Sequence, residues 1–328
     1  MALPIFLFLF LSIPLVSAAG HHLTPDYYAR SCPSFQAVVR DNVYTKQSAV
    51  PSTAAGVLRL FFHDCFTDGC DASLLISSNA YSKGERDAEP NLSLSGDAFD
   101  IITKIKNSLE LTCPGVVSCS DIVAQTTRDL VKMVGGPYYE VLLGRKDSLV
   151  SNISKPNQTL PATDMSMDQI IFQFTSKGFS IKEMVALTGA HTIGFTHCKE
   201  FSHRIYNFSA TSDADPTMNP KLVAGLKKLC QNYSQNPSIA AFNDVRSPSK
   251  FDNAYYRNIL NGLGLLSTDS MMSTDPRTRP IVEVYAANQT AFFQDFADAM
   301  HKTSTHGVKT GKKGEVRLRC DQFNNLPM

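Results

Sequence analysis

The chain has 328 residues and a formal net charge of only +1, and hydrophobic residues make up 43% of it. This near-neutral balance argues against a nucleic-acid-binding protein, and the length is sufficient to bury a large core. Basic residues gather only near the C terminus, where we interpret them as a solvated face. They are Lys309, Lys312, Lys313, Arg317 and Arg319.

Residues 1–20 have the pattern of a secretory signal peptide, because an almost wholly apolar run to Val16 is followed by small residues. The run is too short for a membrane span, and no later segment is apolar enough to cross a bilayer. We therefore expect a secreted protein without a membrane span, whose mature chain begins near residue 21.

Helical periodicity dominates the mature chain, and the best strand-like segment covers residues 139–143. Ser180 and Glu183 have the spacing of a capping box at the start of one helix. The predicted helices cover residues 35–48, 53–66, 98–110, 118–133, 167–177, 181–187, 196–206, 220–230, 253–262, 277–286 and 290–303. We therefore expect a mainly α protein.

Eight cysteines in a secreted chain predict four disulfides, and Cys65 and Cys70 are close enough to pair locally. The pattern leaves the other pairings open. Six Asn-X-Ser/Thr sequons are typical of a glycosylated extracellular protein. They begin at Asn91, Asn152, Asn157, Asn207, Asn232 and Asn288.

The segment from Arg59 to Ser73 contains the densest group of chemically functional side chains. On a helix, Arg59 and His63 lie on one face, where an imidazole moves protons and a guanidinium stabilises developing negative charge. The alternative is a core histidine beside a structural ion pair. Hard oxygen donors follow around Gly69 and predict a cation site. They are Asp64, Asp68, Asp71 and Ser73.

A second polar segment carries Glu85 and, six residues later, Asn91. The amide oxygen of Asn91 is suited to accept a hydrogen bond from His63, which would fix the tautomer of the imidazole. Because Asn91 also begins a sequon, the alternative is a glycosylated surface position.

His191 lies between Gly189 and Gly194, after a predicted helix. Two glycines would let a flat group approach the backbone, and a histidine presented in this way is suited to ligate a metal or haem. The alternative is a histidine that only packs in the core.

Further on, Asp244, Ser247 and Asp252 form a second group of hard oxygens suited to calcium, although Asp252 could instead cap the helix that follows it. Asp269 is a separate candidate.

In this order and spacing, the motifs at 59–65 and 187–194 resemble those of the secreted plant haem peroxidases, class III of the plant peroxidase superfamily. The resemblance covers essentially the whole mature chain. It implies a mainly α, two-lobed fold, with one haem b between a distal and a proximal lobe and a single domain over residues 21–328. It also implies a monomer in the extracellular space or cell wall.

The resemblance implies that hydrogen peroxide is reduced to water while phenolic small molecules or wall polymers are oxidised in two one-electron steps, a reaction linked to oxidative stress. His63 would move the proton between the peroxide oxygens, and Arg59 would stabilise the departing hydroxide. Phe62 would wall the distal pocket, and Asn91, tied to Glu85, would orient His63.

On the proximal side, the resemblance implies that His191 ligates the haem iron and that Asp269 accepts its second N–H. Pro161 would lie at the haem edge, where the phenolic donor binds. Two calcium ions would be held by Asp64, Thr67, Gly69, Asp71 and Ser73, and by Thr192, Asp244, Ser247, Lys250 and Asp252. The disulfides would pair Cys32 with Cys113, Cys65 with Cys70, Cys119 with Cys320, and Cys198 with Cys230.

The chain departs from the usual family pattern in a few places. It contains no tryptophan, Thr163 stands where a second proline is common, Ala190 replaces a more usual glycine, and Ser247 replaces a more usual threonine. Two alternative functions would use some of the same residues. A secreted calcium-dependent binding protein would lack turnover, and a zinc hydrolase would use His63, Asp64 and His191, whose spacing does not suit zinc.

Overall fold

This computed structural model describes residues 23–80 and 82–325, so the expected signal peptide lies outside the described residues. The described chain is mainly α, as the sequence predicts, and its one named sheet has two strands. Within these ranges, the helices fall short of the length and apolar character that a membrane span requires.

The first half of the chain contains five α-helices. They are α1 (Phe35–Ala49), α2 (Thr53–Thr67), α3 (Gly96–Thr112), α4 (Cys119–Met133) and α5 (Lys155–Thr159). The second half contains shorter helices and the two strands. These are α6 (Met167–Ser176), α7 (Ile181–Thr188), β1 (Phe195–His197), α8 (Ser202–Ile205), α9 (Pro220–Cys230), β2 (Ala240–Phe242), α10 (Ala254–Leu260), α11 (Ser267–Met272), α12 (Arg279–Ala287) and α13 (Gln289–Thr305).

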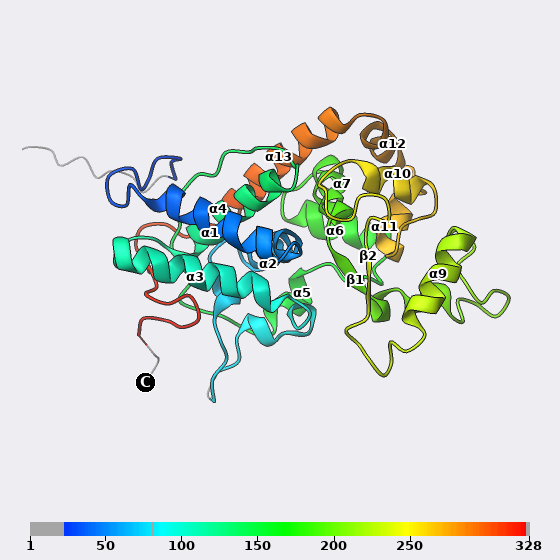
Figure 1. The fold of residues 1–328 in the computed structure, drawn as a ribbon, viewed down its shortest axis with the longest axis horizontal. Coiled ribbons are helices and arrows are strands. Elements are labelled where there is room, and N and C mark those ends of the chain that lie inside the picture. Colours follow the sequence, from blue (N-terminus) through cyan, green and yellow to red (C-terminus); the bar gives the residue numbers. More distant parts are fainter. Residues whose placement is uncertain (1–22, 81, 326–328) are drawn as a thin grey trace, which may run out of the picture.

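The helices form two lobes. Helices α1 to α4 pack on one another in the first lobe, whereas α6, α7, α10, α11 and α12 gather in the second (Figure 1). Helix α13 contacts both α2 and α7, so it ties the lobes together. The predicted two-lobed, mainly α fold is therefore confirmed.

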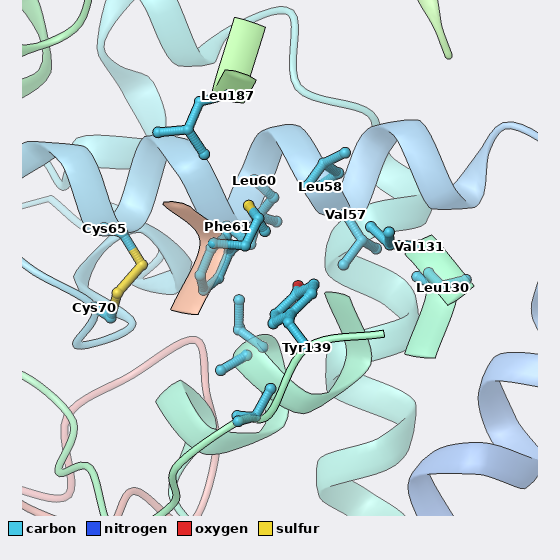
Figure 2. Close-up of a cluster of buried hydrophobic side chains, with 14 of the residues drawn as sticks. Val57, Leu58, Leu60, Phe61, Cys65, Cys70, Leu130, Val131, Tyr139 and Leu187 are labelled. Carbon is cyan, nitrogen blue, oxygen red and sulfur yellow. A yellow bond between two sulfur atoms is a disulfide. The ribbon is translucent and has the colours of Figure 1, made fainter. Parts of the chain in front are cut away.

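Helix α2 is the centre of the first lobe because one of its faces is almost wholly apolar. Val57, Leu60 and Phe61 are buried and lie in the same cluster as Val131 of α4 (Figure 2). Burying a side chain of this size contributes roughly 1.5–3 kcal/mol. Leu187 at the end of α7 joins this cluster, so the core is continuous between the lobes.

The start of α7 confirms the predicted capping box. The Ser180 side chain accepts from the Glu183 main-chain nitrogen, and the Glu183 side chain accepts from the Ser180 main-chain nitrogen. These contacts satisfy two N–H groups that the first turn leaves unpaired. They fix the start of the helix that leads directly to His191.

All four expected disulfides are present: Cys32–Cys113, Cys65–Cys70, Cys119–Cys320 and Cys198–Cys230. Cys65–Cys70 closes the end of α2, and Cys119–Cys320 joins α4 to the C-terminal segment. The ends of the first lobe are therefore held covalently.

Two predictions about local structure are wrong, and two short helices are missed. Residues 196–206 do not form one helix, because β1 pairs with β2 at their start and the rest divides into a 3₁₀ turn, Cys198–Glu200, and the short helix α8. Residues 139–143 form no named strand, because only Leu143 finds a bridge partner, Thr24. The short helices α5 and α11 were not predicted.

The expected basic face near the C terminus is also partly wrong. Arg317 is fully buried and donates to the main-chain oxygens of Ala72 and Ser148, each at 2.8 Å. Lys309 pairs with the carboxylate of Asp71. Periodicity does not detect these contacts, since their partners are more than 150 residues away in the chain.

Candidate active site

The guanidinium of Arg59 is held by the loop that follows residue 90. Nη1 donates to the Ser93 carbonyl oxygen at 3.1 Å, and Nη2 donates to the Pro90 carbonyl oxygen at 3.1 Å and to Ser93 Oγ at 3.0 Å. The sequence did not indicate these partners, because two of the three acceptors are main-chain oxygens. They fix a positive charge one helical turn before His63.

His63 is buried and oriented by Asn91. Its Nδ1 lies 2.6 Å from Asn91 Oδ1, and Asn91 Nδ2 donates to the Glu85 carbonyl oxygen at 2.7 Å. Because the amide nitrogen is already a donor, Oδ1 must accept, which assigns the proton of His63 to Nδ1. The second ring nitrogen, Nε2, therefore keeps a free lone pair.

The electrostatic environment of His63 favours a neutral base. Burial and then the charge of Arg59 lower the pKa of His63 to about 3, and the hydrogen bond with Asn91 opposes this only in part. The imidazole is therefore uncharged at neutral pH and can accept a proton.

The expected link between Glu85 and Asn91 runs through the main chain of Glu85. The carboxylate of Glu85 instead accepts from Ser73 Oγ at 2.9 Å. Burial raises the pKa of Glu85 to about 7. The carboxyl group therefore belongs with the oxygen donors that follow α2.

The structure speaks against a glycan at Asn91. This side chain is 3% exposed, and both of its amide atoms are hydrogen-bonded. The asparagines of the other five sequons are exposed: Asn152, Asn157, Asn207, Asn232 and Asn288.

His191 lies in a 3₁₀ turn, Gly189–Thr192, that continues from α7. Its Nδ1 lies 3.0 Å and 3.2 Å from the two carboxylate oxygens of Asp269 in α11. The Asp269 side chain is only 4% exposed, whereas that of His191 is 38% exposed. A carboxylate on Nδ1 assigns the proton to that nitrogen, so Nε2 is free to ligate a metal.

The pKa of His191 moves in the direction opposite to that of His63. Burial alone would lower the pKa of His191, but the charge of Asp269 and its hydrogen bond raise it above the usual value. Asp269 therefore increases the basicity of the imidazole, which strengthens a bond from Nε2 to iron.

The two histidine motifs come together around Arg59, although they are far apart in the sequence. The charge of Arg59 acts on the pKa of both His63 and His191. Gly194 brings the second segment onto α2, because an added Cβ would lie 3.0 Å from the Cβ of Ala55. Phe62 of α2 is half-buried and stacks on Phe66 at 4.6 Å.

The glycines on either side of His191 permit close packing within the protein. A Cβ on Gly189 would lie 2.3 Å from Tyr256 Oη and 2.5 Å from Phe292. Gly194 likewise lies close to Ala55 of α2.

The oxygen donors after α2 form a buried, acidic group. The carboxylate of Asp64 accepts from the main-chain nitrogens of Ala72, Asp71 and Leu74 at 2.9, 3.2 and 3.3 Å. Burial, the charge of Asp71 and the charge of Glu85 raise the pKa of Asp64 well above its usual value. Three buried carboxyl groups thus lie near one another, and a cation there would offset their repulsion.

Other expected donors lie nearby. Thr67 Oγ1 donates to the His63 carbonyl oxygen at 2.7 Å, and the Thr67 carbonyl oxygen, the candidate ligand, accepts from Lys177 Nζ at 3.4 Å. Gly69 adopts φ +125°, a conformation that suits glycine. Asp68, in contrast, is exposed and pairs with Lys155 at 3.2 Å. The sequence did not indicate that Lys309 would contact Asp71.

The second oxygen group also assembles. Thr192 Oγ1 and Ser247 Oγ each lie 3.4 Å from Asp244 Oδ2, and Ser247 Oγ lies 3.1 Å from Asp252 Oδ1. Asp252 Oδ1 also accepts from the Ala254 main-chain nitrogen at 2.7 Å, so it helps to start α10 as well. The ammonium of Lys250 lies 3.9 Å from Asp252.

Neither group is an all-carboxylate metal site. In the part of the chain that the structure describes, no three His, Cys, Asp or Glu side chains are arranged to hold a metal ion. A hard cation at either place would therefore also need hydroxyl and main-chain oxygens, which calcium accepts. The same finding speaks against a zinc site formed by His63, Asp64 and His191.

Pro161 is half-buried in the segment between α5 and α6. Nearby in the sequence, Thr163 Oγ1 donates to Glu200 Oε2 at 3.1 Å. This bond joins the segment to the turn that follows β1.

Comparison with known proteins agrees with this arrangement. A family model described as Peroxidase matches residues 37–288. Peroxidase 65 of Arabidopsis thaliana is 56% identical over 313 residues, which cover 95% of this chain and 92% of that protein. Peroxidase 63 of the same plant is 53% identical over 321 residues, which cover 98% and 96%. The chain therefore belongs to the peroxidase family, among the class III plant haem peroxidases.

Proposed function

We propose that this peroxidase uses His63 and Arg59 on one side of a haem b, and His191 on the other, to reduce hydrogen peroxide with electrons from phenolic donors. The observation that supports this most strongly is the position of Arg59, whose charge acts on both histidines. Each histidine has its Nδ1 engaged by a side-chain oxygen, which leaves both Nε2 atoms for chemistry. When bound, the haem supplies the iron that takes up peroxide and stores the oxidising equivalents.

On the distal side, Nε2 of His63 would accept a proton from hydrogen peroxide and return it to the departing oxygen. The pKa of His63, lowered to about 3 by burial and by Arg59, keeps the imidazole neutral for the first transfer. The guanidinium of Arg59 stabilises the negative charge that develops on the departing oxygen.

On the proximal side, His191 would hold the iron through Nε2. Asp269 accepts from Nδ1 and gives the imidazole partial imidazolate character, which favours the more oxidised states of the iron. Phe62 walls the pocket, and phenolic donors approach near Pro161.

Two calcium ions brace the histidines. Each ion has a ligand directly after a histidine, Asp64 after His63 and Thr192 after His191. The buried carboxyl groups described above support this assignment, because a cation offsets their repulsion. The distal set is Asp64, Thr67, Gly69, Asp71 and Ser73, and the proximal set is Thr192, Asp244, Ser247, Lys250 and Asp252, in which Thr67, Gly69 and Lys250 contribute main-chain carbonyls.

The protein acts as a glycosylated monomer in the extracellular space or cell wall, where phenolic molecules and wall polymers are its partners. Four disulfides and five exposed sequons support this location. The large core, which includes residues from Tyr28 to Cys320, supports one domain over residues 21–328.

Substitution of each histidine separates the two sides of the site. We expect His63→Leu to slow the reaction with peroxide by several orders of magnitude while the haem stays bound, and His191→Ala to weaken haem binding. His203→Leu is the control, because His203 is exposed and bonds only with Ser267. Stopped-flow absorption of the haem band and peroxide-dependent oxidation of guaiacol measure both effects. Loss of haem in His63→Leu alone would reverse the assignment of the two sides.

A further inference from the structure

We propose that three buried tyrosines, Tyr255, Tyr256 and Tyr285, form a redox relay that carries oxidising equivalents from His191 toward the protein surface beside Asp295. We call these three residues the tyrosine relay. The inference rests on the proposed role of His191 as the iron ligand. The relay extends the proposed function, because electrons would reach the oxidised site through the protein as well as from donors at the haem edge.

The first tyrosine lies directly against the proximal histidine. The ring of Tyr255 is 6.1 Å from that of His191, centre to centre, in an edge-on arrangement. Tyr255 therefore contacts the part of the site whose charge changes when the iron is oxidised or reduced.

From Tyr255 the aromatic contacts continue without a gap. The ring centres of Tyr255 and Tyr256 are 5.1 Å apart, and those of Tyr256 and Tyr285 are also 5.1 Å apart. All three side chains are almost completely buried, at 1%, 0% and 0% exposure. The relay thus crosses from α10 to α12 with neighbouring rings in contact, so an electron passes only short gaps between the rings.

The outer end of the relay has a proton acceptor with access to solvent. Tyr285 Oη donates to Asp295 Oδ2 at 2.8 Å, and Asp295 Oδ1 pairs with Lys182 at 2.8 Å. The side chains of Asp295 and Lys182 are 20% and 60% exposed. A buried phenol is difficult to oxidise when its proton has nowhere to go, and Asp295 removes this obstacle for Tyr285.

The step balances in electrons and protons. Tyr285 gives one electron to the site oxidised by peroxide, and its phenolic proton passes to Asp295. The electron crosses the rings of Tyr256 and Tyr255, which keep their phenolic protons and are not themselves oxidised. A neutral tyrosyl radical then remains at Tyr285. A phenolic donor at the surface returns one electron, Asp295 returns the proton, and the donor leaves as a phenoxyl radical after it loses its own proton to water.

This route suits phenols that are attached to a polymer and too large to approach the haem edge.

Packing alone does not require the phenolic hydroxyls of the relay, because Phe292 lies in the same cluster. Its ring centre is 4.9 Å from that of Tyr256 and 5.8 Å from that of Tyr285. A phenylalanine ring therefore fits this environment, and Tyr→Phe is a conservative test of the hydroxyl group.

The test uses the haem-loaded enzyme mixed with hydrogen peroxide and no donor, frozen within milliseconds, and examined by electron paramagnetic resonance. We expect a tyrosyl radical that narrows when ring-deuterated tyrosine is incorporated, and that Tyr285→Phe reduces severalfold. Asp295→Asn should also lower the radical yield, because the amide remains near the phenol but is a much weaker base.

Tyr28→Phe is the matched control. Tyr28 is also a buried phenol that donates to a carboxylate, Asp121, at 2.7 Å, but it lies outside the relay. We expect the Tyr28→Phe enzyme to give the same radical yield as the unmodified enzyme. A radical unchanged by Tyr285→Phe, or lowered equally by Tyr28→Phe, would overturn the relay. The haem absorption band distinguishes a failure of the relay from a failure of the proposed function. If peroxide changes the band but the radical does not depend on Tyr285, only the relay fails. If peroxide does not change the band at all, the proposed function fails.

A second measurement addresses the donor. The rate of oxidation of a phenol linked to a large soluble polymer is divided by the rate for the same phenol free in solution. We expect this ratio to fall severalfold in Tyr285→Phe and to stay constant in Tyr28→Phe. An unchanged ratio in Tyr285→Phe would overturn the assignment of the relay to polymer-bound donors.

Discussion

Oδ1 of Asn91 accepts a hydrogen bond of 2.6 Å from Nδ1 of His63. The amide is itself fixed by the carbonyl oxygen of Glu85, so the main chain of one loop determines the tautomer of a histidine in α2. This relationship leaves Nε2 of His63 with a free lone pair, which the proposed role as a base requires.

Replacement of Asn91 by Ala removes this control of the tautomer. We expect the reaction with hydrogen peroxide to slow by about 10–100-fold, the range seen when an orienting partner of a histidine is lost. Stopped-flow absorption of the haem band measures this rate. Asn232→Ala, at an exposed sequon, is the control and should leave the rate unchanged. An equal loss in both variants would contradict the assigned role.

Replacement of Asp269 by Asn removes the negative charge next to His191 while the side-chain shape is kept. We expect the Fe(III)/Fe(II) midpoint potential to rise, because a less basic imidazole stabilises the ferric state less. Spectroelectrochemical titration measures the potential. Asp298→Asn, at an exposed carboxylate in α13, is the control. A potential that stays constant in Asp269→Asn would show that Asp269 does not tune the iron.

Lys309 pairs with the carboxylate of Asp71, so it would compete with the proposed calcium ion for this group. Substitution by Met removes this positive charge, so we expect calcium to bind the distal group more tightly, by a factor on the order of ten. Isothermal titration of the chelated protein with calcium measures the affinity. Lys155→Met is the control, because Lys155 pairs with the exposed Asp68 in the same loop. If both substitutions changed the calcium affinity equally, the overall charge of the protein, and not the contact of Lys309 with Asp71, would determine that affinity.

Gly189 is required for packing behind His191. We expect Gly189→Ala to lower the free energy of unfolding by about 1–3 kcal/mol, because the added Cβ overlaps Tyr256 and Phe292. Gly225→Ala, in α9, meets nothing within 4 Å and should stabilise by up to ~1 kcal/mol. Denaturant unfolding measures both. A stable Gly189→Ala would mean that the neighbouring rings can move aside.

The sequence was sufficient for the parts of the site that local motifs encode. The spacing of Arg59 and His63 placed them on one helix face, and the capping box at Ser180 correctly started the helix that leads to His191. The pairing of the cysteines came from the family resemblance and is confirmed by the four disulfides.

The remaining features depend on contacts that no local pattern encodes. Residues 196–206 have a helical pattern, but pairing with β2 turns their start into β1. Arg59 is held mainly by the main-chain oxygens of Pro90 and Ser93. The positions of these oxygens depend on the backbone conformation of the loop and not on the side chains of the loop. Lys309 and Arg317 read as surface charges until the C-terminal segment packs against the loop after α2.

The most direct test of the account is a crystal structure of the haem-loaded protein with anomalous diffraction data at the iron absorption edge. We predict an iron peak bonded to Nε2 of His191, with His63 and Arg59 on the opposite face of the haem. An iron bonded to His63, or a haem that does not lie between the two histidines, would contradict the proposed function.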